Sequence, residues 1–177
     1  VLDTYQLFSK TPINSLADPE GMKVAGAGYN LRYLEGIPGA AGVRGGLPTF
    51  YNMVQTGVTE AAMLWPEAAK TFKIAEVAPY MLKADLGAVN SKTVTVNNDF
   101  WAGLPSEVQD VLQSVAVEYR DHIASVAMDR AASSLDAYIA GGGTVVEMSD
   151  DARKAWADSM PNIAVDWAKQ LDSTGAP

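Results

Sequence analysis

The stretch GGLPTFYNMVQTGVTEAAMLWPEAA, residues 45–69, predicts a helix, a turn, a short strand and a second helix in close succession. Pro48 stands where a first helical residue is expected, and there its fixed φ is favourable and its missing N–H costs nothing. Gly57 is placed to end that helix, and the apolar run of residues 61–65 precedes Pro66, which opens the next helix. In open α/β sheets ligands bind at the ends of such strands, so this stretch is the first place to expect a binding site.

The same alternation of short apolar runs and helical segments extends to both sides of this stretch. We expect strands at residues 4–9, 22–25, 40–44, 61–65, 86–97 and 144–147. We expect helices at residues 30–35, 48–56, 66–73, 105–140, 150–160 and 162–171. The strand at 86–97 is expected to be extended, because β-branched residues alternate along it. Short apolar strands that alternate with helices indicate a parallel or mixed sheet with both faces covered.

The helix that opens at Pro105 and closes at the three glycines 141–143 is the longest expected in the chain. Apolar residues hold a helical period along its whole length. At 1.5 Å per residue it is about 50–55 Å long, which exceeds the width of a domain of this size. Such a helix is expected to span two lobes, or to brace a second lobe that this sequence does not contain.

The composition excludes several classes of protein. With 177 residues, of which 48% are hydrophobic and 19% charged, the chain is that of a globular protein. Its net charge of −8 and its lack of Lys/Arg clusters argue against nucleic acid as a partner. The absence of cysteine excludes structural disulfides and cysteine-ligated zinc. No apolar run approaches the roughly 20 residues that span a bilayer, and we expect any export signal to be removed or to lie upstream.

Two patterns resemble chemical sites but fall short of them. Gly26 and Gly28 follow a strand and precede a helix, yet Leu31 stands where a dinucleotide-binding loop needs its third glycine. We therefore expect no cofactor. His122 is the only histidine, and it has no partner at the spacing of a metal site or a catalytic triad. We expect no metal site, no catalytic residues and a protein that is not an enzyme.

Two residues at strand ends are candidates for ligand contacts. Arg44 follows a predicted strand and sits among glycines, and there a guanidinium can hold a carboxylate through two parallel hydrogen bonds. Trp65 ends the strand of residues 61–65 and offers a large ring as a wall of the same cleft. For each residue the ordinary interpretation is about equally favoured, namely a solvated loop arginine and a tryptophan packed in the core.

Four landmarks resemble the TRAP-transporter periplasmic solute-binding proteins. DPEGMKV at residues 18–24 is similar to the family's D-x-x-G-[LM]-K-[VI] segment, and YNMVQTGV at residues 51–58 is similar to its E-x-Y-x-x-L-Q-x-G-V helix and turn. KIAEVAPY at residues 73–80 resembles the family's approach to the hinge strand. Residues 96–109 resemble the V-N-x-x-x-W-x-x-L-P-x-x-V-Q start of its long helix. The four landmarks occur in the family's order and cover nearly the whole chain.

The resemblance implies a two-lobed periplasmic receptor that closes on a small organic acid and delivers it to membrane transporter subunits. It implies an α/β fold, a periplasmic-binding-protein-like lobe with a mixed central sheet, a long bracing helix and C-terminal helices. The chain is then expected to be the C-terminal portion of such a receptor, without the N-terminal lobe. The expected parts are a second-lobe βα core at residues 1–84, a hinge strand and linker at 85–103, a long inter-lobe helix at 104–141, and a C-terminal strand and helices at 142–177.

The chain departs from the family pattern at the expected ligand site. Ala25 stands where the family has its carboxylate-binding arginine, so Arg44 is the expected replacement. Trp65 stands near where many members have an asparagine, which implies a more apolar pocket and a monocarboxylate with an apolar or aromatic body. Asp85, near the hinge strand, is a candidate to receive a cationic group instead, and Tyr29 is a candidate for a further contact.

A rival hypothesis from another class is an interaction module. In this hypothesis, surface that normally faces the missing lobe binds a second copy of the chain or another partner. An apolar face left bare favours such association.

Overall fold

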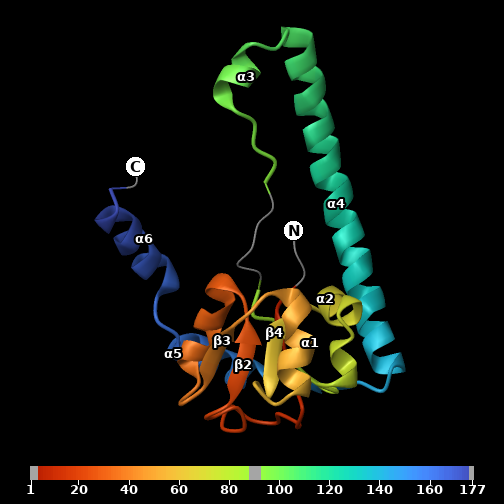
Figure 1. Cartoon of the computed structure of the whole chain (residues 1–177), viewed down its shortest axis with the longest axis vertical. Coiled ribbons are helices and arrows are strands. Elements are labelled where there is room, and N and C mark those ends of the chain that lie inside the picture. The colour runs from red at the N-terminus through yellow and green to blue at the C-terminus, as the bar shows by residue number, and fades with distance from the viewer. Residues whose placement is uncertain (1–3, 88–92, 176–177) are drawn as a thin grey trace.

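The computed structural model describes residues 4–87 and 93–175, which form an α/β lobe from which one long helix projects (Figure 1). A six-stranded sheet lies at the centre of the lobe, with the strand order β3-β2-β4-β1-β5-β6. The strands are β1 (Gln6–Ser9), β2 (Lys23–Gly26), β3 (Ala41–Arg44), β4 (Ala61–Leu64), β5 (Tyr80–Lys83) and β6 (Thr144–Glu147).

Helices cover both faces of this sheet and continue beyond it. Two are 3₁₀-helices, η1 (Gly28–Gly36) and η2 (Ile74–Glu76). The α-helices are α1 (Leu47–Gln55), α2 (Pro66–Thr71), α3 (Asn98–Ala102), α4 (Ser106–Ala140), α5 (Asp150–Ser159) and α6 (Ile163–Ser173). The mixed α/β architecture expected from the sequence is therefore confirmed.

The direction of β1 sets the topology of the sheet. β1 runs antiparallel to both of its neighbours, β4 and β5, whereas the other pairings of the described strands are parallel. The carboxyl ends of the five remaining strands and the start of β1 therefore lie along one edge, which we call the carboxyl edge. The chain enters β1 beside the segment that leaves β5, because Tyr5 N–H donates to Gly87 O at 3.0 Å and Leu86 N–H donates to Tyr5 O at 3.2 Å.

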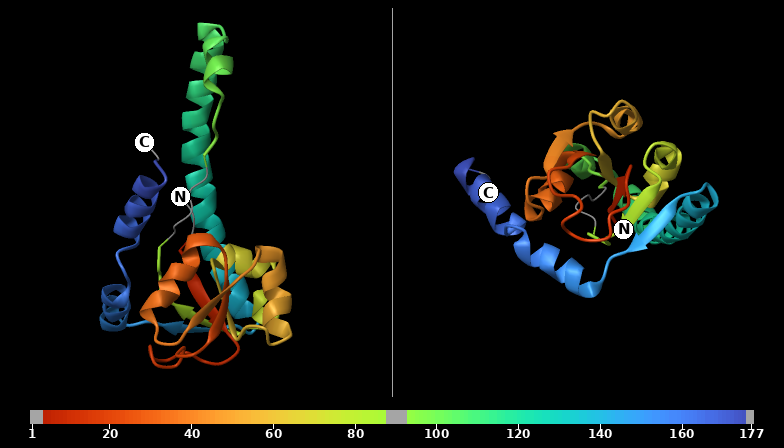
Figure 2. Two further views of the ribbon diagram at one scale, coloured as in Figure 1. Left: turned by 60° about the vertical axis from the view of Figure 1, so that its left-hand side comes forward. Right: turned by 90° about the horizontal axis from the view of Figure 1, so that it is seen from below.

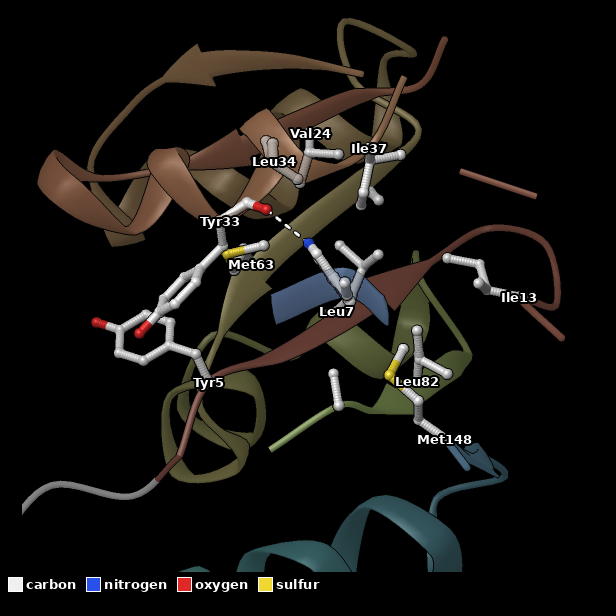
Figure 3. Close-up of a cluster of buried hydrophobic side chains, with 13 residues drawn as sticks. Tyr5, Leu7, Ile13, Val24, Tyr33, Leu34, Ile37, Met63, Leu82 and Met148 are labelled. Carbon is white, nitrogen blue, oxygen red and sulfur yellow. Dashed lines mark hydrogen bonds between the residues drawn. The ribbon is translucent and has the colours of Figure 1, made fainter. Parts of the chain in front are cut away.

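Each face of the sheet carries its own apolar cluster. Figure 3 shows the first face, where Leu7 and Met63 pack beneath η1 and α5. Trp156 of α5 is fixed there, since its indole N–H donates to Tyr33 O at 2.7 Å. On the second face Phe8 packs with residues of α1, α2 and the end of α4. Consecutive residues of β1 thus serve opposite faces, as the pleat of a strand requires, and the whole strand is buried.

Two glycines allow η1 to lie directly on the sheet. Gly26 of β2 and Gly42 of β3 both face the side chain of Leu31 in η1. A Cβ at position 42 would lie 2.8 Å from Cδ2 of Leu31, which is closer than real side chains approach. The two glycines therefore set the distance between η1 and the edge strand β3.

The C-terminal end of α4 is anchored in the second apolar cluster. Tyr138 is 4% exposed, its ring meets Phe8 edge to face at 5.4 Å, and its hydroxyl donates to Ala78 O at 3.1 Å. Burial raises the pKa of the Tyr138 hydroxyl. This anchor fixes the direction in which α4 leaves the lobe.

The N-terminal half of α4 is bare. α4 has 35 residues and is therefore about 52 Å long, and it rises far above the sheet (Figures 1 and 2). Every residue from 110 to 123 is exposed. Val111, Val115, Tyr119 and Ile123 follow one another at helical spacing along this half, and they form what we call the bare stripe. The long helix expected from Pro105 onward is thus confirmed, and most of its apolar residues have no covering layer in the described structure.

One predicted strand is wrong. The structure places a strand at Tyr80–Lys83 and none at residues 93–97, while residues 88–92 of the predicted strand lie outside the described residues. Val94 is 86% exposed, so its β-branched shape has no neighbouring strand to pack against, and strand propensity acts mainly through such packing. The sequence YMLK has no β-branched residue, yet it forms β5 because Met81 and Leu82 are buried between β1 and β6.

We predict that Gly42→Ala lowers the free energy of unfolding by about 1–3 kcal/mol, because the added methyl group forces Leu31 and η1 away from the sheet. Gly103→Ala is the matched control, since a Cβ there would meet its nearest neighbour at an ordinary 3.5 Å. Urea denaturation measures both. Equal midpoints for the two variants would contradict the close packing of η1 on β3.

Candidate functional site

Arg44 ends β3 at the carboxyl edge, opposite Gly26 in the parallel register with β2. It lines a hollow of ≈ 290 Å³ between η1 and β3. The other residues around the hollow are Gly28, Leu31, Arg32, Leu34, Glu35, Ala40 and Gly42. Arg44 is exposed, and among the described residues its guanidinium has no hydrogen bond or ion pair. Arg44 therefore adds an unpaired positive charge to the lining of the hollow.

Arg32 lines the same hollow but already has partners. Its Nε donates to Glu35 Oε1 at 3.0 Å, and its Nη2 donates to Asp166 Oδ2 of α6 at 3.0 Å. Hydrogen bonds to Glu35 first, and then to Asp166, raise the pKa of Arg32. Arg32 thus ties α6 to η1, and this leaves Arg44 as the arginine of the hollow with an uncommitted charge. The Glu35 pairing could be read from the i, i+3 spacing, whereas the Asp166 pairing could not.

Tyr29 stands at the start of η1 and is 45% exposed. It follows Gly28, which lines the hollow and has φ +56°. Tyr29 itself is not among the residues that line the hollow. Its exposure leaves it available to a ligand, and its contact with one stays a prediction.

Trp65 follows β4 at the same edge and is partly buried against both apolar clusters. Its ring meets Tyr5 edge to face at 5.5 Å, and its Nε1 donates to Glu67 Oε2 at 3.1 Å. Arg44 ends β3 and Trp65 follows β4. Since β2 lies between these two strands, they are two strand spacings apart, about 9–10 Å. They share the carboxyl edge, but Trp65 does not line the hollow beside Arg44.

Asp85 follows β5 and is engaged with the start of the chain. Its Oδ1 accepts hydrogen bonds from Gln6 Nε2 at 2.8 Å and from Thr4 Oγ1 at 3.1 Å, and its own N–H donates to Gln6 Oε1 at 3.0 Å. Arg153 of α5 lies 4.0 Å from Oδ2 and donates to Ala84 O at 3.0 Å. With its side chain 37% exposed, Asp85 fixes the chain where it leaves β5. Its proposed contact with a cationic ligand group stays a prediction.

Asn30 and Tyr33 of η1 were not singled out by the sequence. Asn30 is 2% exposed, and its Oδ1 has no hydrogen-bond partner within the described part of the chain. Tyr33 lies beside Tyr5 on the first face (Figure 3), and burial, followed by the nearby Tyr5, raises the pKa of the Tyr33 hydroxyl. Ala25 is fully buried in the second cluster, so no charge stands at the position that corresponds to the family's arginine.

His122 lies on the bare half of α4, is exposed, and is not among the residues that line the hollow. Within residues 4–87 and 93–175, no group of three or more His, Cys, Asp or Glu side chains could hold a metal ion. None of the helices in that part of the chain is both long and apolar enough to cross a bilayer.

The carboxyl edge of the sheet thus carries the unpaired Arg44 and the partly buried Trp65, and at this edge the chain enters β1 and leaves β5. Residues 3–170 match the family described as "Bacterial extracellular solute-binding protein, family 7", DctP. The chain belongs to this family of solute-binding proteins. Members of this family are substrate-binding receptors of transporters and are not enzymes. The TRAP-type members are periplasmic, as the resemblance implied.

Comparisons with individual proteins agree with this assignment. The C4-dicarboxylate-binding periplasmic protein DctP of Rhodobacter capsulatus is 27% identical over 122 residues, which cover 68% of this chain and 36% of that protein. An open complex of a TRAP periplasmic solute-binding protein from Desulfovibrio salexigens has a TM-score of 0.80 at 21% identity, over 98% of this chain and 54% of that one. In that crystal the C-terminus of a symmetry mate is bound in the ligand-binding site.

A third match is a TRAP periplasmic solute-binding protein from Roseobacter denitrificans with bound β-D-glucuronate. Its TM-score is 0.79 at 20% identity, and the match covers 97% of this chain and 57% of that one. The likeness to the two solved structures shows the fold. The chain spans about half of the length of these structures and 36% of the R. capsulatus protein.

We predict that Arg32→Ala speeds amide hydrogen exchange in α6, because the bond to Asp166 ties that helix to η1. An exposed ion pair is weak, so the rate is expected to rise by at most about 5-fold. Arg120→Ala is the control, since Arg120 pairs with its neighbour Asp121 on the bare half of α4. Unchanged exchange in α6 would contradict the tether.

Proposed function

We propose that this chain is the second lobe of an extracytoplasmic solute receptor for a TRAP-type secondary transporter. The receptor binds a small organic carboxylate by closing two lobes over it. The main support for this proposal is the unpaired guanidinium of Arg44, which lines the hollow at the carboxyl edge. In a protein with a net charge of −8, a free arginine at a strand end is the group best suited to select an anion.

The chemistry of the guanidinium favours a carboxylate. Its planar fork matches the two oxygens of a carboxylate, and such charge-assisted pairs are stronger than neutral hydrogen bonds. The matched proteins support this ligand class. One is named for C4-dicarboxylates, one is bound to glucuronate, and one holds a polypeptide C-terminus in its site.

The remainder of the ligand is proposed to be apolar or aromatic, with a single carboxylate. Ala25 is buried and uncharged, so the second charge that would favour a dicarboxylate is missing at that position. Trp65 offers a large ring at the neighbouring strand end, with Tyr5 behind it. Tyr29 is proposed as a further contact. Asp85 is the proposed contact for a cationic group, should the ligand carry one.

The other, N-terminal lobe of the receptor is proposed to cover the bare stripe of α4. An apolar stripe exposed over residues 110–123 is costly in water, and the matched structures are nearly twice the length of this chain. In this division, residues 1–84 are the βα core, 85–103 the hinge and linker, 104–141 the inter-lobe helix, and 142–177 the C-terminal strand and helices. Closure would follow from contacts that exist only in the shut state. The closed receptor would then deliver its ligand to the membrane subunits of the transporter.

We predict that Arg44→Ala weakens binding of the carboxylate ligand by about 10–100-fold, because the charge-assisted hydrogen bonds are lost. Arg44→Lys is expected to lie between this variant and the wild type, since it keeps the charge but loses the fork. Calorimetry of the full-length protein against a panel of mono- and dicarboxylates measures the effect, with Arg120→Ala as the control. Undiminished affinity of Arg44→Ala for every ligand of the panel would refute the role of Arg44.

The bare stripe also supports the rival function, an interaction module that binds a second copy of itself. We predict that the full-length protein sediments as a monomer, because its other lobe covers the stripe. A dimer that dissociates with Val115→Asp but not with Gln113→Asp would instead support the interaction module. Gln113 is the matched control, because it lies on the same exposed turns but outside the stripe.

A further inference from the structure

Trp65 is held from two directions before any ligand arrives. The register of β1 with β4 pairs Gln6 with Leu64, so Tyr5 and Trp65 stand opposite each other one residue further along. The ring of Tyr5, which is 2% exposed, meets the indole edge to face at 5.5 Å. Glu67 holds the other end of the indole, because its Oε2 accepts the Nε1–H bond at 3.1 Å.

The bond between Glu67 and Trp65 is not an ordinary contact within a helix. Trp65 precedes α2 and has an extended backbone with φ −97° and ψ 157°, whereas Glu67 lies in the first turn of α2. The side chain of Glu67 therefore reaches back over the start of the helix to the indole. A carboxylate acceptor makes this bond stronger than a neutral acceptor would, and it restricts the rotation of the indole about its side-chain bonds.

The charge of Glu67 is countered from the long helix. Arg130 of α4 places Nη1 at 3.9 Å from Glu67 Oε1, with side chains 65% and 40% exposed, respectively. At this exposure the pair contributes little to stability. Its effect is on charge, because an uncompensated carboxylate beside Trp65 would repel an anionic ligand at the same edge.

We propose that Glu67 is a positioning residue for the ligand site, and that it holds the indole of Trp65 in the orientation that receives the body of the ligand. This inference rests on the proposed function, since it gives Trp65 the role of a site wall. Holding the ring in place beforehand removes part of the ordering cost that binding would otherwise carry. Glu67 does not itself touch the ligand.

The competing interpretation is that Glu67 only stabilises α2 as an acidic residue in its first turn. That role would change stability, but the orientation of the indole would then have no effect on ligand affinity. Glu67→Gln separates the two roles, because it removes the charge near the helix start while it keeps an oxygen that can accept the indole N–H bond.

The test uses the full-length protein with ¹⁵N-labelled tryptophan, and the indole N–H resonance of Trp65 is assigned with Trp65→Phe. Glu67→Ala is expected to shift this resonance and to leave those of Trp101, Trp156 and Trp167 in place. Glu67→Gln is expected to restore most of the wild-type position. Glu107→Ala, which removes a first-turn acid from α4, is the control and should not move the Trp65 resonance.

Affinity is measured on the same variants with the carboxylate that the wild type binds best. Glu67→Ala is expected to weaken binding by about 3–10-fold, the scale of one hydrogen bond, and Glu67→Gln by less. An unmoved Trp65 resonance, or wild-type affinity in Glu67→Ala, would overturn this inference alone. A wild type that binds no carboxylate would overturn the proposed function, and the positioning role with it.

Discussion

The antiparallel strand β1 is the constraint on which the rest of this lobe depends. It lies between β4 and β5 and is the described strand that joins the β3-β2-β4 half of the sheet to the β5-β6 half. Leu7 and Phe8 are fully buried on opposite faces, so this one strand contributes to both apolar clusters. Because β1 runs against its neighbours, its start and the end of β5 meet at the carboxyl edge. There the hydrogen bonds of Tyr5 with Leu86 and Gly87 join the segment that enters β1 to the segment that leaves β5.

The candidate site follows from that arrangement. The ends of β2, β3 and β4 bring Gly28, Arg44 and Trp65 to the edge at which the chain enters and leaves the lobe. Glycines at positions 26 and 42 bring η1 onto the sheet and shape the hollow beside Arg44. Trp65 takes its orientation from β1 through Tyr5 and from α2 through Glu67. A hinge at the same edge would let closure act directly on the ligand contacts.

The sequence was sufficient wherever local signals and burial agree. Pro66 opens α2 and Gly57 follows α1, as expected, so these two residues lie on either side of β4. The sequence failed where tertiary contacts decide. β5 forms from residues without a β-branched side chain, and Val94 remains exposed outside any strand. Bonds such as Asp85 to Gln6 and Arg32 to Asp166 join residues 79 and 134 positions apart. No local pattern predicts them, and for that reason the sequence could not foresee that Asp85 is already engaged.

In the proposed receptor, Arg44 binds a carboxylate at the carboxyl edge of a lobe that closes on its ligand. The most direct measurement is a crystal structure of the full-length protein with its tightest-binding carboxylate. We expect both carboxylate oxygens within about 2.7–3.2 Å of the Arg44 guanidinium, with the body of the ligand against the ring of Trp65. A carboxylate held by other residues, with Arg44 pointing into solvent, would contradict it.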